Sequence, residues 1–586
     1  MKNVTIALTG SGGTGVVALG EMVLQVAARL GFYGILRKTF GPQIRGGESA
    51  AIVRLGPRPL ASFGETIDLL LVLDWTNFQR FADEIPLTDT TLIIEDTAAG
   101  TAPAALQRAT RLDFSGLARQ QGSAHSNIAA LGYLGSWLGC DGGQIERALE
   151  QRLQHHGADT LALVRRVAQA GSHLHTVSPL ALAAPATVTG GERGKEREQE
   201  REQESGERWL ATGNQLAGLG ALEAGIRFVA AYPITPASDA LEWMAGRIEQ
   251  QGGHLVQAED ELAAINMAIG AGFGGVPAMT ATSGPGLALM AEAMGLAVAS
   301  ETPLVILNVM RGGPSTGIPT KSEQSDFNLA VYGLHGDAPH VVMAALTIAD
   351  CHHTLGWAVA VASERQTLSI VLSDQFLGQS MQILPPLAEG AFKAEPVSAS
   401  LPPAEGGDYF RYLNTDNGVS PVALPGQAGG MYTADGLEHS EQALPSAKAQ
   451  DHQTQLDKRQ RKLESLVDSP HWGECCRQQG AELLILCFGS LYPIALEAQQ
   501  ILLGESLPVN VVGIRLLSPP PLAQIRQCMD EVKQVVVIEQ NHQGQFARYL
   551  RSFGLSFCSY HRPGPRLFTP GELVRQVKEM RHAESQ

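Results

Sequence analysis

The sequence predicts an α/β protein of several domains, and three observations lead to this fold class. The chain has 586 residues, which is more than one hydrophobic core accommodates, so two to four domains are expected. It contains 64 glycines and only 6% aromatic residues, a composition typical of tight strand-to-helix turns and unlike that of a β-sandwich. Short apolar runs are followed by Gly/Pro-rich turns and helical patterns, as expected for α/β units.

The composition also narrows the classes of partner and compartment. The formal net charge is −16, which argues against nucleic acid or an anionic membrane as a partner, because both require a basic surface. The opening MKNVTIALTGSGGTG lacks the apolar core and cleavage site of a signal peptide. No stretch approaches the length of a membrane span without Gly, Pro or charge. We therefore expect a soluble, cytoplasmic protein.

The cysteines do not predict a metal site. The chain has seven of them, and none forms a C-x-x-C pair. Because that local spacing usually holds an iron–sulfur cluster or zinc, no metal ligands are assigned to this chain. Small buried thiols in a reducing compartment are the favoured interpretation.

Residues 1–185 are predicted to form a first domain with a Rossmann-like pattern. A strand, VTIALTG, leads through a Gly-rich turn into an apolar helix, GVVALGEMVLQVAARLG. DLLLVLD and TLIIED are typical of further buried strands. Residues 186–208 have almost no apolar side chains and are predicted to be a charged, solvated linker.

Residues 209–389 and 479–586 are predicted to form two more α/β domains. The strands of the first are RFVAAYP, HLVQA, PAMTATS, PLVILNVM and LSIVLSD, and those of the second are ELLILCFGS, PVNVVGIRLLSP and QVVVIEQN. Residues 390–478 are poor in strands and contain a charged helix, HQTQLDKRQRKLESLV. We expect them to form either a loop-rich insert that closes over a site or a linker.

The turn after the first strand, TGSGGTGVV, is a candidate phosphate site. Gly10, Gly12 and Gly15 fit G-x-G-x-x-G between a strand and a helix, where backbone N–H groups can approach a phosphate. A dinucleotide fold usually places an acid about 20 residues further on, but GILRKTFG supplies Arg37 and Lys38 instead. These cations suit a phosphorylated ribose, as in NADP or coenzyme A. A turn used only for packing is the alternative.

Three segments of the second domain supply further candidates. HLVQAEDELAAINMAIGAGFGG places three consecutive acids at the start of a helix, where capping alone would explain them. In AAYPITPASD, two prolines stiffen an extended loop around Thr235. In NVMRGGPSTGIPTKSEQSD, Arg311 ends a strand among small residues, which suits capture of a carboxylate or phosphate. A surface ion pair with Glu323 or Asp326 is the alternative.

These segments carry a family resemblance. AAYPITPASD, QAEDELAAINMAIGAGFGG, MTATSGPGLALMAEAMGLA, RGGPSTGIPTKSEQSD and VVVIEQNHQGQ resemble the α subunit of 2-oxoacid:ferredoxin oxidoreductases. LTGSGGTGVVALGEMV and KTFGPQIRGGESAAIVRLG resemble their γ subunit, so the chain resembles a fused γ–α protein over nearly its whole length. The resemblance implies a Rossmann-like γ domain, a thiamine-diphosphate pyrimidine-type domain and a transketolase-C-terminal-like domain. RYLNTDNGVSPVALPG and KRQRKLES most resemble the 2-oxoglutarate branch.

The resemblance also implies roles for individual residues. The family uses thiamine diphosphate, and a carboxylate bonded to its aminopyrimidine promotes the proton shift that activates the cofactor. The family places this group at Glu259, so that Asp260 and Glu261 remain helix-start residues. The other matching positions are Tyr232 and Pro233 at the cofactor and Thr235 and Arg311 at the substrate. Thr320, farther along the same loop, is expected at the distal end of the substrate. We also expect Gly12, Gly13, Thr14 and Arg45 to contribute to coenzyme A binding.

The family's magnesium–diphosphate motif is missing. We find no G-D-G with a suitably placed downstream Asn, and HGDAP and GGDYF are poor substitutes. The chain is therefore expected to supply only the pyrimidine side of the cofactor site. It would need a β subunit that holds the diphosphate, Mg²⁺ and a [4Fe–4S] cluster, in a heterotetramer made of two γα–β pairs.

The predicted function is that of a subunit of 2-oxoglutarate:ferredoxin oxidoreductase. The reaction implied is the conversion of 2-oxoglutarate and coenzyme A to succinyl-CoA and CO₂ with reduction of ferredoxin, or its reverse as a carboxylating synthase in a reductive TCA cycle. A pyruvate or branched-chain 2-oxoacid enzyme is the alternative within the family. An NADP-binding protein or a non-catalytic scaffold is the alternative of another class.

Overall fold

The computed structural model describes residues 3–41, 47–80, 82–140, 142–153, 157–174, 208–394 and 409–584. The N-terminal unit consists of Met1–Thr212, Gln379–Leu387 and Thr569–Gly571. The C-terminal unit consists of Gly213–Gly378, Ala388–Phe568 and Glu572–Gln586. All but the last residue of the predicted linker lies outside the described residues. Within the described part of the chain, no helix is long and apolar enough to cross a membrane.

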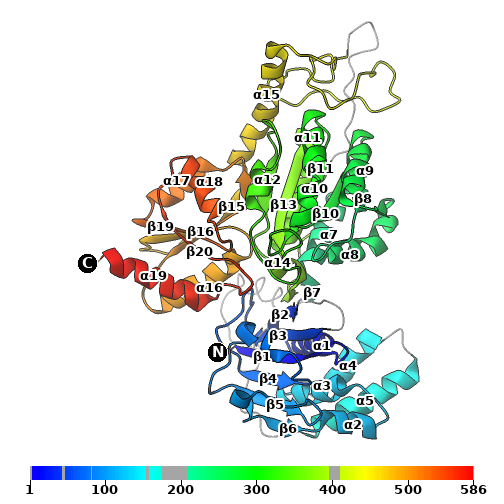
Figure 1. Ribbon diagram of the computed structural model, residues 1–586, viewed down its shortest axis with the longest axis vertical. Helices are drawn as coiled ribbons and strands as arrows, with labels where there is room; N and C mark the ends of the chain where they lie inside the picture. The colour runs from blue at the N-terminus through cyan, green and yellow to red at the C-terminus, as the bar shows by residue number, and fades with distance from the viewer. Residues whose placement is uncertain are drawn as a thin grey trace, which may run out of the picture. The chain divides into compact units, whose positions relative to one another are not determined.

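The N-terminal unit is built on an eight-stranded sheet in the order β6-β5-β4-β1-β3-β2-β14-β7 (Figure 1). Its strands are β1 (Val4–Ser11), β2 (Tyr33–Phe40), β3 (Glu48–Gly56), β4 (Leu69–Val72), β5 (Leu92–Asp96), β6 (Thr110–Leu112), β7 (Trp209–Thr212) and β14 (Met381–Leu384). β1, β4, β5 and β6 run parallel, whereas β2 and β3 run antiparallel as a hairpin. The predicted α/β class is confirmed, with a mixed sheet in this unit.

The two faces of this sheet are covered differently. One face packs against the helices α1 (Val16–Arg29), α2 (Phe114–Gln120), α3 (Ser126–Trp137), α4 (Gly142–Leu153) and α5 (Ala158–Ser172). On α1, a Cβ at Gly20 would lie 2.8 Å from the Cβ of Ala51, so glycine allows the helix to approach β3 closely. The other face packs against the loop after β4, where Trp75 and Phe78 join the core.

Two strands of the N-terminal sheet, β7 and β14, flank residues 213–378 of the C-terminal unit in the sequence. β7 ends immediately before Gly213, and β14 begins after Ser380. β14 pairs antiparallel with both β2 and β7, with Met381 opposite both Leu36 and Thr212. The two units therefore cut across the predicted boundary at residue 209, and the five-part division of the chain stays a prediction.

The C-terminal unit contains a seven-stranded sheet in the order β18-β12-β13-β11-β10-β8-β9 (Figure 1). Its strands are β8 (Phe228–Ala231), β9 (His254–Gln257), β10 (Ala278–Thr282), β11 (Leu304–Met310), β12 (Val341–Ala344), β13 (Leu368–Asp374) and β18 (Leu516–Ser518). All neighbours pair parallel except β12 and β18. The helices between the strands are α7 (Gly213–Glu223), α8 (Ser238–Ile248), α9 (Glu261–Phe273), α10 (Gly284–Leu289), α11 (Ala291–Ala299), α12 (Phe327–Tyr332), α13 (Asp350–Arg365) and α14 (Gln375–Gln379). The five predicted strands are all present.

A five-stranded sheet completes this unit, in the order β15-β17-β16-β19-β20. It consists of β15 (Gly473–Cys476), β16 (Leu483–Cys487), β17 (Asn510–Ile514), β19 (Gln534–Glu539) and β20 (Cys558–His561), with α16 (Leu491–Gly504), α17 (Leu522–Asp530), α18 (Gln545–Ser552) and α19 (Pro570–Glu584). One core joins both sheets: the ring of Phe327 lies 5.7 Å from Phe488, 5.6 Å from Phe546 and 5.3 Å from Tyr549.

The predicted insert packs at the amino-terminal ends of the parallel strands. Its helix, α15 (Ala449–Glu464), lies at the end of the sheet opposite α14, which follows the carboxyl end of β13 (Figure 1). The residues it contacts, Glu301 and Gln366, come just before β11 and β13. The described part of the insert thus packs against the amino-terminal ends of the strands, and its predicted closure over a site stays a prediction.

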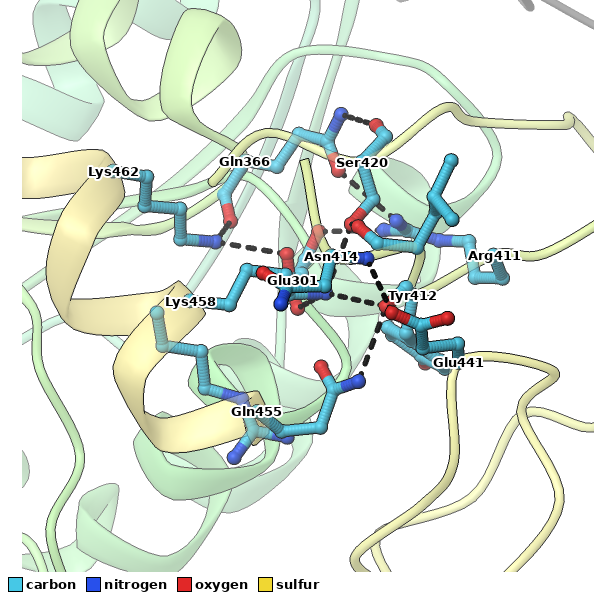
Figure 2. A network of polar contacts seen from close by, with 12 residues as sticks. Glu301, Gln366, Arg411, Tyr412, Asn414, Ser420, Glu441, Gln455, Lys458 and Lys462 are labelled. Carbon is cyan, nitrogen blue, oxygen red and sulfur yellow. Dashed lines mark hydrogen bonds and ion pairs between the residues drawn. The ribbon is translucent and has the colours of Figure 1, made fainter. Parts of the chain in front are cut away.

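A buried charge cluster holds the insert in place (Figure 2). Glu301 contacts Lys458 Nζ at 2.7 Å and Lys462 Nζ at 3.1 Å, and all three side chains are at most 2% exposed. Arg411 Nη2 donates to the Glu301 carbonyl at 3.0 Å. Burial alone would raise the pKa of Glu301, but Lys462, Lys458 and Arg411 hold that pKa below its ordinary value. Burial lowers the pKa of Lys458 to about 8, although Glu301 opposes the shift.

Candidate active site

The predicted site residues of the C-terminal unit gather at one edge of the seven-stranded sheet. β11, β10, β8 and β9 are neighbours and run parallel, so their carboxyl ends lie along the same edge. Arg311 follows β11, Tyr232 and Pro233 follow β8, and Glu259 lies two residues beyond β9. In open α/β sheets this edge is where ligands bind. The chain order alone separates these residues widely, and the sheet order brings them together.

The three consecutive acids after β9 have three different environments. Asp260 is the N-cap of α9 and accepts a hydrogen bond from the Ala263 backbone N–H at 2.7 Å. Glu261 is the first helical residue and is buried at 6% exposure, where a Cβ at Gly286 would lie 2.6 Å from its Oε1. Glu259 is exposed at the sheet edge. As predicted, Asp260 caps the helix and Glu261 lies in its first turn, whereas the predicted role of Glu259 at a ligand stays a prediction.

Arg311 is a buried residue that links two loops. Its Nη1 donates to the carbonyl of Thr235, and its Nη2 donates to the carbonyl of Thr316 at 2.8 Å. At 6% exposure it is not the surface arginine of the alternative interpretation. Its Nε has no hydrogen-bond partner among the described residues, and each Nη carries a second N–H. Arg311 therefore fixes both loops and retains donors for an anion.

A carboxyl group that the sequence did not single out as a site residue lies beside this arginine. Asp326 Oδ2 accepts a hydrogen bond from Asn308 Nδ2 at 3.0 Å, and a Cβ at Gly284 would lie 2.6 Å from its Oδ1. Burial raises the pKa of Asp326 to about 6, whereas Asn308 and Arg311 oppose the shift. The only signal in the sequence is its position at the end of the RGGPSTGIPTKSEQSD segment, where it is an alternative ion-pair partner of Arg311.

The loop after Arg311 is a short hairpin with an exposed tip. The backbone N–H of Ile318 donates to the Gly312 carbonyl at 2.7 Å, and the Gly312 N–H donates to the Lys321 carbonyl at 3.0 Å. Thr316 at the tip is exposed, whereas Thr320 is buried at 3% exposure. The predicted contact of Thr320 with the distal end of a substrate stays a prediction.

The Gly-rich turn of the N-terminal unit has a shape that its glycines impose. Gly13 and Gly15 have positive φ of 95° and 75°. A Cβ at Gly15 would also lie 2.4 Å from Nδ2 of Asn127. Thr14 Oγ1 donates to the Ser11 carbonyl at 2.7 Å, so the hydroxyl braces the turn. Gly12 and Gly13 are exposed, and the turn remains open to a ligand at these positions.

The basic residues near this turn are committed to internal ion pairs. Lys38 Nζ lies 2.8 Å from Glu21, and Arg37 Nη2 lies 3.8 Å from Glu84 and donates to the Glu84 carbonyl at 3.3 Å. Both side chains therefore have acidic partners within the N-terminal unit, and their interpretation as a ribose-phosphate site stays a prediction. Arg45 lies outside the described residues.

Comparisons with known proteins bear on this geometry. A family model described as "Pyruvate flavodoxin/ferredoxin oxidoreductase, thiamine diP-bdg" matches residues 219–458, and one described as "Pyruvate ferredoxin/flavodoxin oxidoreductase" matches residues 5–174. The 2-oxoglutarate synthase subunit KorA of Archaeoglobus fulgidus is 35% identical over 57% of this chain and 88% of its own length. The chain belongs to the 2-oxoacid:ferredoxin oxidoreductases.

Other members of the family match to different extents. Subunit alpha of 2-oxoacid:ferredoxin oxidoreductase 2 from Aeropyrum pernix is 34% identical, but the match spans only 56% of its length and 58% of this chain. The solved structure of 2-oxoglutarate:ferredoxin oxidoreductase from Magnetococcus marinus, with 2-oxoglutarate, coenzyme A and succinyl-CoA bound, has a TM-score of 0.89 and 32% identity. It covers 99% of both chains. The predicted family and the α/β fold are confirmed.

The thiamine diphosphate-binding model covers every predicted site residue of the C-terminal unit. Residues 219–458 include Tyr232 and Pro233, Thr235, Glu259, Arg311 and Thr320. An exposed carboxylate at the ligand-binding edge of the sheet fits the pyrimidine half of that cofactor, because it can accept or share a proton with a ring nitrogen. Among the described residues, no group of three or more His, Cys, Asp or Glu side chains could hold a metal ion.

Proposed function

We propose that the chain is the combined γ–α subunit of a 2-oxoglutarate:ferredoxin oxidoreductase. With a β partner it would convert 2-oxoglutarate and coenzyme A to succinyl-CoA and CO₂ while ferredoxin is reduced, or run the reverse reaction. The observation that carries this proposal is the match to the Magnetococcus marinus enzyme over 99% of both chains, because that enzyme was solved with 2-oxoglutarate, coenzyme A and succinyl-CoA bound. The KorA relatives, named for 2-oxoglutarate, support the same substrate.

Glu259 would act on the pyrimidine side of thiamine diphosphate, with Tyr232 and Pro233 against the ring. When bound, this cofactor supplies a carbon nucleophile and an electron sink for decarboxylation. The Glu259 carboxylate would hold a proton at the ring nitrogen, which a neutral amide cannot do. Its exposure at the end of β9, beside the turn after β8, supports the role.

Arg311, Thr235 and Thr320 would bind the 2-oxoacid. The free N–H groups of Arg311 suit the carboxylate beside the reacting carbonyl, because a guanidinium can grip both oxygens in one plane. Thr235 would add a hydroxyl from the loop that Arg311 fixes through the Thr235 carbonyl. Thr320 would meet the distal end of the substrate.

The Gly-rich turn of the N-terminal unit would contribute to coenzyme A binding. Gly12 and Gly13 are exposed, and a Cβ at Gly13 would meet no atom within 4 Å. Arg45, in the next Gly-rich loop, would supply a charge. Arg37 and Lys38 would serve a phosphate only by sharing their charge with Glu84 and Glu21.

The partner would be a β subunit that holds the diphosphate, Mg²⁺ and a [4Fe–4S] cluster, in a dimer of γα–β pairs. The motivation is that neither the sequence nor the described residues supply a diphosphate motif or a cluster of metal ligands. The relatives from Aeropyrum pernix and Archaeoglobus fulgidus are named as subunits.

The proposal is tested by substrate-dependent dye reduction with the co-purified partner. We expect activity to require 2-oxoglutarate and coenzyme A, and Glu259→Gln to lower turnover by about a hundredfold or more without loss of assembly. Asp260→Ala is the matched control: it should lower the stability of α9 by about 0.5–2 kcal/mol and leave turnover within a few fold. Near-normal turnover of Glu259→Gln would return all three acids to a structural role.

A further inference from the structure

Two thiols in the C-terminal unit touch, away from the candidate active site. Cys475 lies on β15, the edge strand of the five-stranded sheet, and Cys528 lies on α17. Their Sγ atoms are 4.0 Å apart. Cys528 is buried in the core beneath α17, and the half-buried Cys475 packs against that core. The function proposed above uses neither thiol.

The neighbouring cysteine on the same strand faces the other side of the sheet. Because side chains alternate along a strand, Cys476 packs against the opposite core, and its Sγ donates to Gln499 Oε1 at 3.1 Å. Cys558 is exposed on β20. These two residues are therefore natural controls for any chemistry that depends on the contact between Cys475 and Cys528.

A guanidinium lies against one member of the pair. Arg477 Nη2 is 3.5 Å from Cys528 Sγ, and Arg477 also binds Glu531. The thiol–thiol contact with Cys475 and the positive charge of Arg477 lower the pKa of Cys528, although burial opposes the shift. The Arg477 side chain is 47% exposed, whereas Cys528 is buried at 3% exposure, so peroxide would have to approach Cys528 from beside Arg477.

We infer that Cys475 and Cys528 form a site of reversible thiol oxidation by hydrogen peroxide. The Cys528 thiolate attacks one peroxide oxygen, the O–O bond breaks, and a sulfenic acid forms while the other oxygen leaves as hydroxide and takes up a proton. The Cys475 sulfur then attacks the Cys528 sulfur; its thiol proton joins the departing hydroxyl as water, and an S–S bond forms. Two thiols are oxidised and one peroxide is reduced to two waters.

The bond would require the two sulfurs, now 4.0 Å apart, to approach each other. A disulfide requires sulfurs about 2 Å apart, and rotation of the two side chains supplies the remaining approach of about 2 Å. The bond would join residues 53 apart in sequence. The bond would also link β15 to α17. The chain segments next to these two elements are already in contact, because the N–H groups of Arg515 and Leu516, between β17 and α17, donate to the Trp472 carbonyl before β15. We expect oxidation to raise the unfolding temperature of the C-terminal unit.

The test uses the full-length chain, reduced, freed of reductant and treated with hydrogen peroxide. Thiol titration and peptide mass spectrometry should show the loss of two of the seven thiols and a Cys475–Cys528 peptide pair lighter by two hydrogen atoms. Dithiothreitol should restore both thiols, and calorimetry should show the upward shift in unfolding temperature. Cys475→Ser and Cys528→Ser should each abolish the linked pair, whereas Cys476→Ser and Cys558→Ser should retain it.

Two results would overturn the inference. One is a linked peptide that joins other cysteines in the wild-type chain. The other is oxidation of Cys528 to sulfinic acid while the Cys475 thiol persists. The wild-type peptide map reads the pair directly, so the test does not depend on the folding of any variant, and it is independent of the proposed enzymatic function.

Discussion

At the scale of single residues, Arg311 has two roles that one side chain must satisfy at once. It donates to the carbonyls of Thr235 and Thr316 and so holds both loops at the sheet edge. It also remains the cation that a 2-oxoacid carboxylate would meet there. Loss of this side chain would therefore remove a substrate contact and loosen the loop that carries Thr235.

We predict that Arg311→Ala lowers kcat/KM at least about tenfold to a hundredfold for 2-oxoglutarate and pyruvate alike. A charged hydrogen bond contributes about 1.5–3 kcal/mol, and about 1.4 kcal/mol corresponds to one decade. Both substrates carry the carboxylate beside the carbonyl, so both should suffer. Steady-state kinetics of the enzyme with its partner give the measurement.

Two further variants separate the roles. Arg311→Lys keeps the positive charge but loses the planar guanidinium that can bind both carboxylate oxygens. Its kcat/KM should therefore lie between those of Arg311→Ala and the wild type. Thr320→Val should change the preference between the two substrates instead, if Thr320 meets the distal carboxylate. If Arg311→Ala lowers kcat/KM for 2-oxoglutarate but not for pyruvate, Arg311 binds the distal carboxylate, and the roles assigned to Arg311 and Thr320 are reversed.

Much of the candidate site could be predicted because the ends of buried strands can be recognised in the sequence. Glu259 and Arg311 follow apolar runs, and parallel strands bring such ends to one edge. The sequence could not predict that Lys38 pairs with Glu21 and Arg37 with Glu84. These partners are 17 and 47 residues apart, and only the packing of a helix and loops on the sheet brings them together. The environment of Asp326 likewise depends on β10 and β11 being neighbours.

At the scale of elements, α15 is a helix whose buried face is polar. Gln455, Lys458, Arg459 and Lys462 recur at helical spacing and are buried, whereas Glu464 on the same helix is exposed. Such a helix reads in the sequence as a solvated, charged segment, because the usual signal of burial is an apolar stripe. The sequence thus predicted the helix but not its packing against the sheet. That packing requires Glu301, a buried acid that lies just before β11.

We predict that Glu301→Gln destabilises the docking of α15 by about 3–5 kcal/mol, because Lys458 and Lys462 would then be buried without a counter-charge. Native-state hydrogen exchange should show the α15 amides exchanging about a hundredfold to several thousandfold faster than in the wild type. Glu464→Gln, on the exposed side of α15, should leave the exchange unchanged. Unaltered protection in Glu301→Gln would mean that apolar contacts hold the insert without the ion pairs.

At the scale of the whole molecule, the two units share a chain that crosses between them more than once. β7 and β14 complete the N-terminal sheet, although residues 213–378 between them belong to the C-terminal unit. The sequence indicated a domain boundary from the charged linker. It could not indicate that two short strands beyond the linker return to the first sheet, because four-residue apolar runs carry too little pattern.

We predict that residues 1–185 expressed alone aggregate, because β2 would become an unprotected edge strand. Co-expressed with residues 209–586 as a separate chain, they should form a stable complex that co-purifies, since β14 would still pair with β2. Gln382→Pro in the second fragment should weaken this complex, because proline removes a ladder hydrogen bond. A stable, monomeric 1–185 fragment that ignores its counterpart would contradict the prediction.

The pairing of β7 with β14 has a mechanical consequence. Thr212 and Met381 are direct partners in an antiparallel pair, so residues 213–378 leave the sheet and return to it at the same place. A single covalent tether swivels freely about its backbone bonds, but two hydrogen-bonded strands can twist only together, as a ribbon. The start and the end of residues 213–378 are therefore held side by side by backbone hydrogen bonds of the N-terminal sheet.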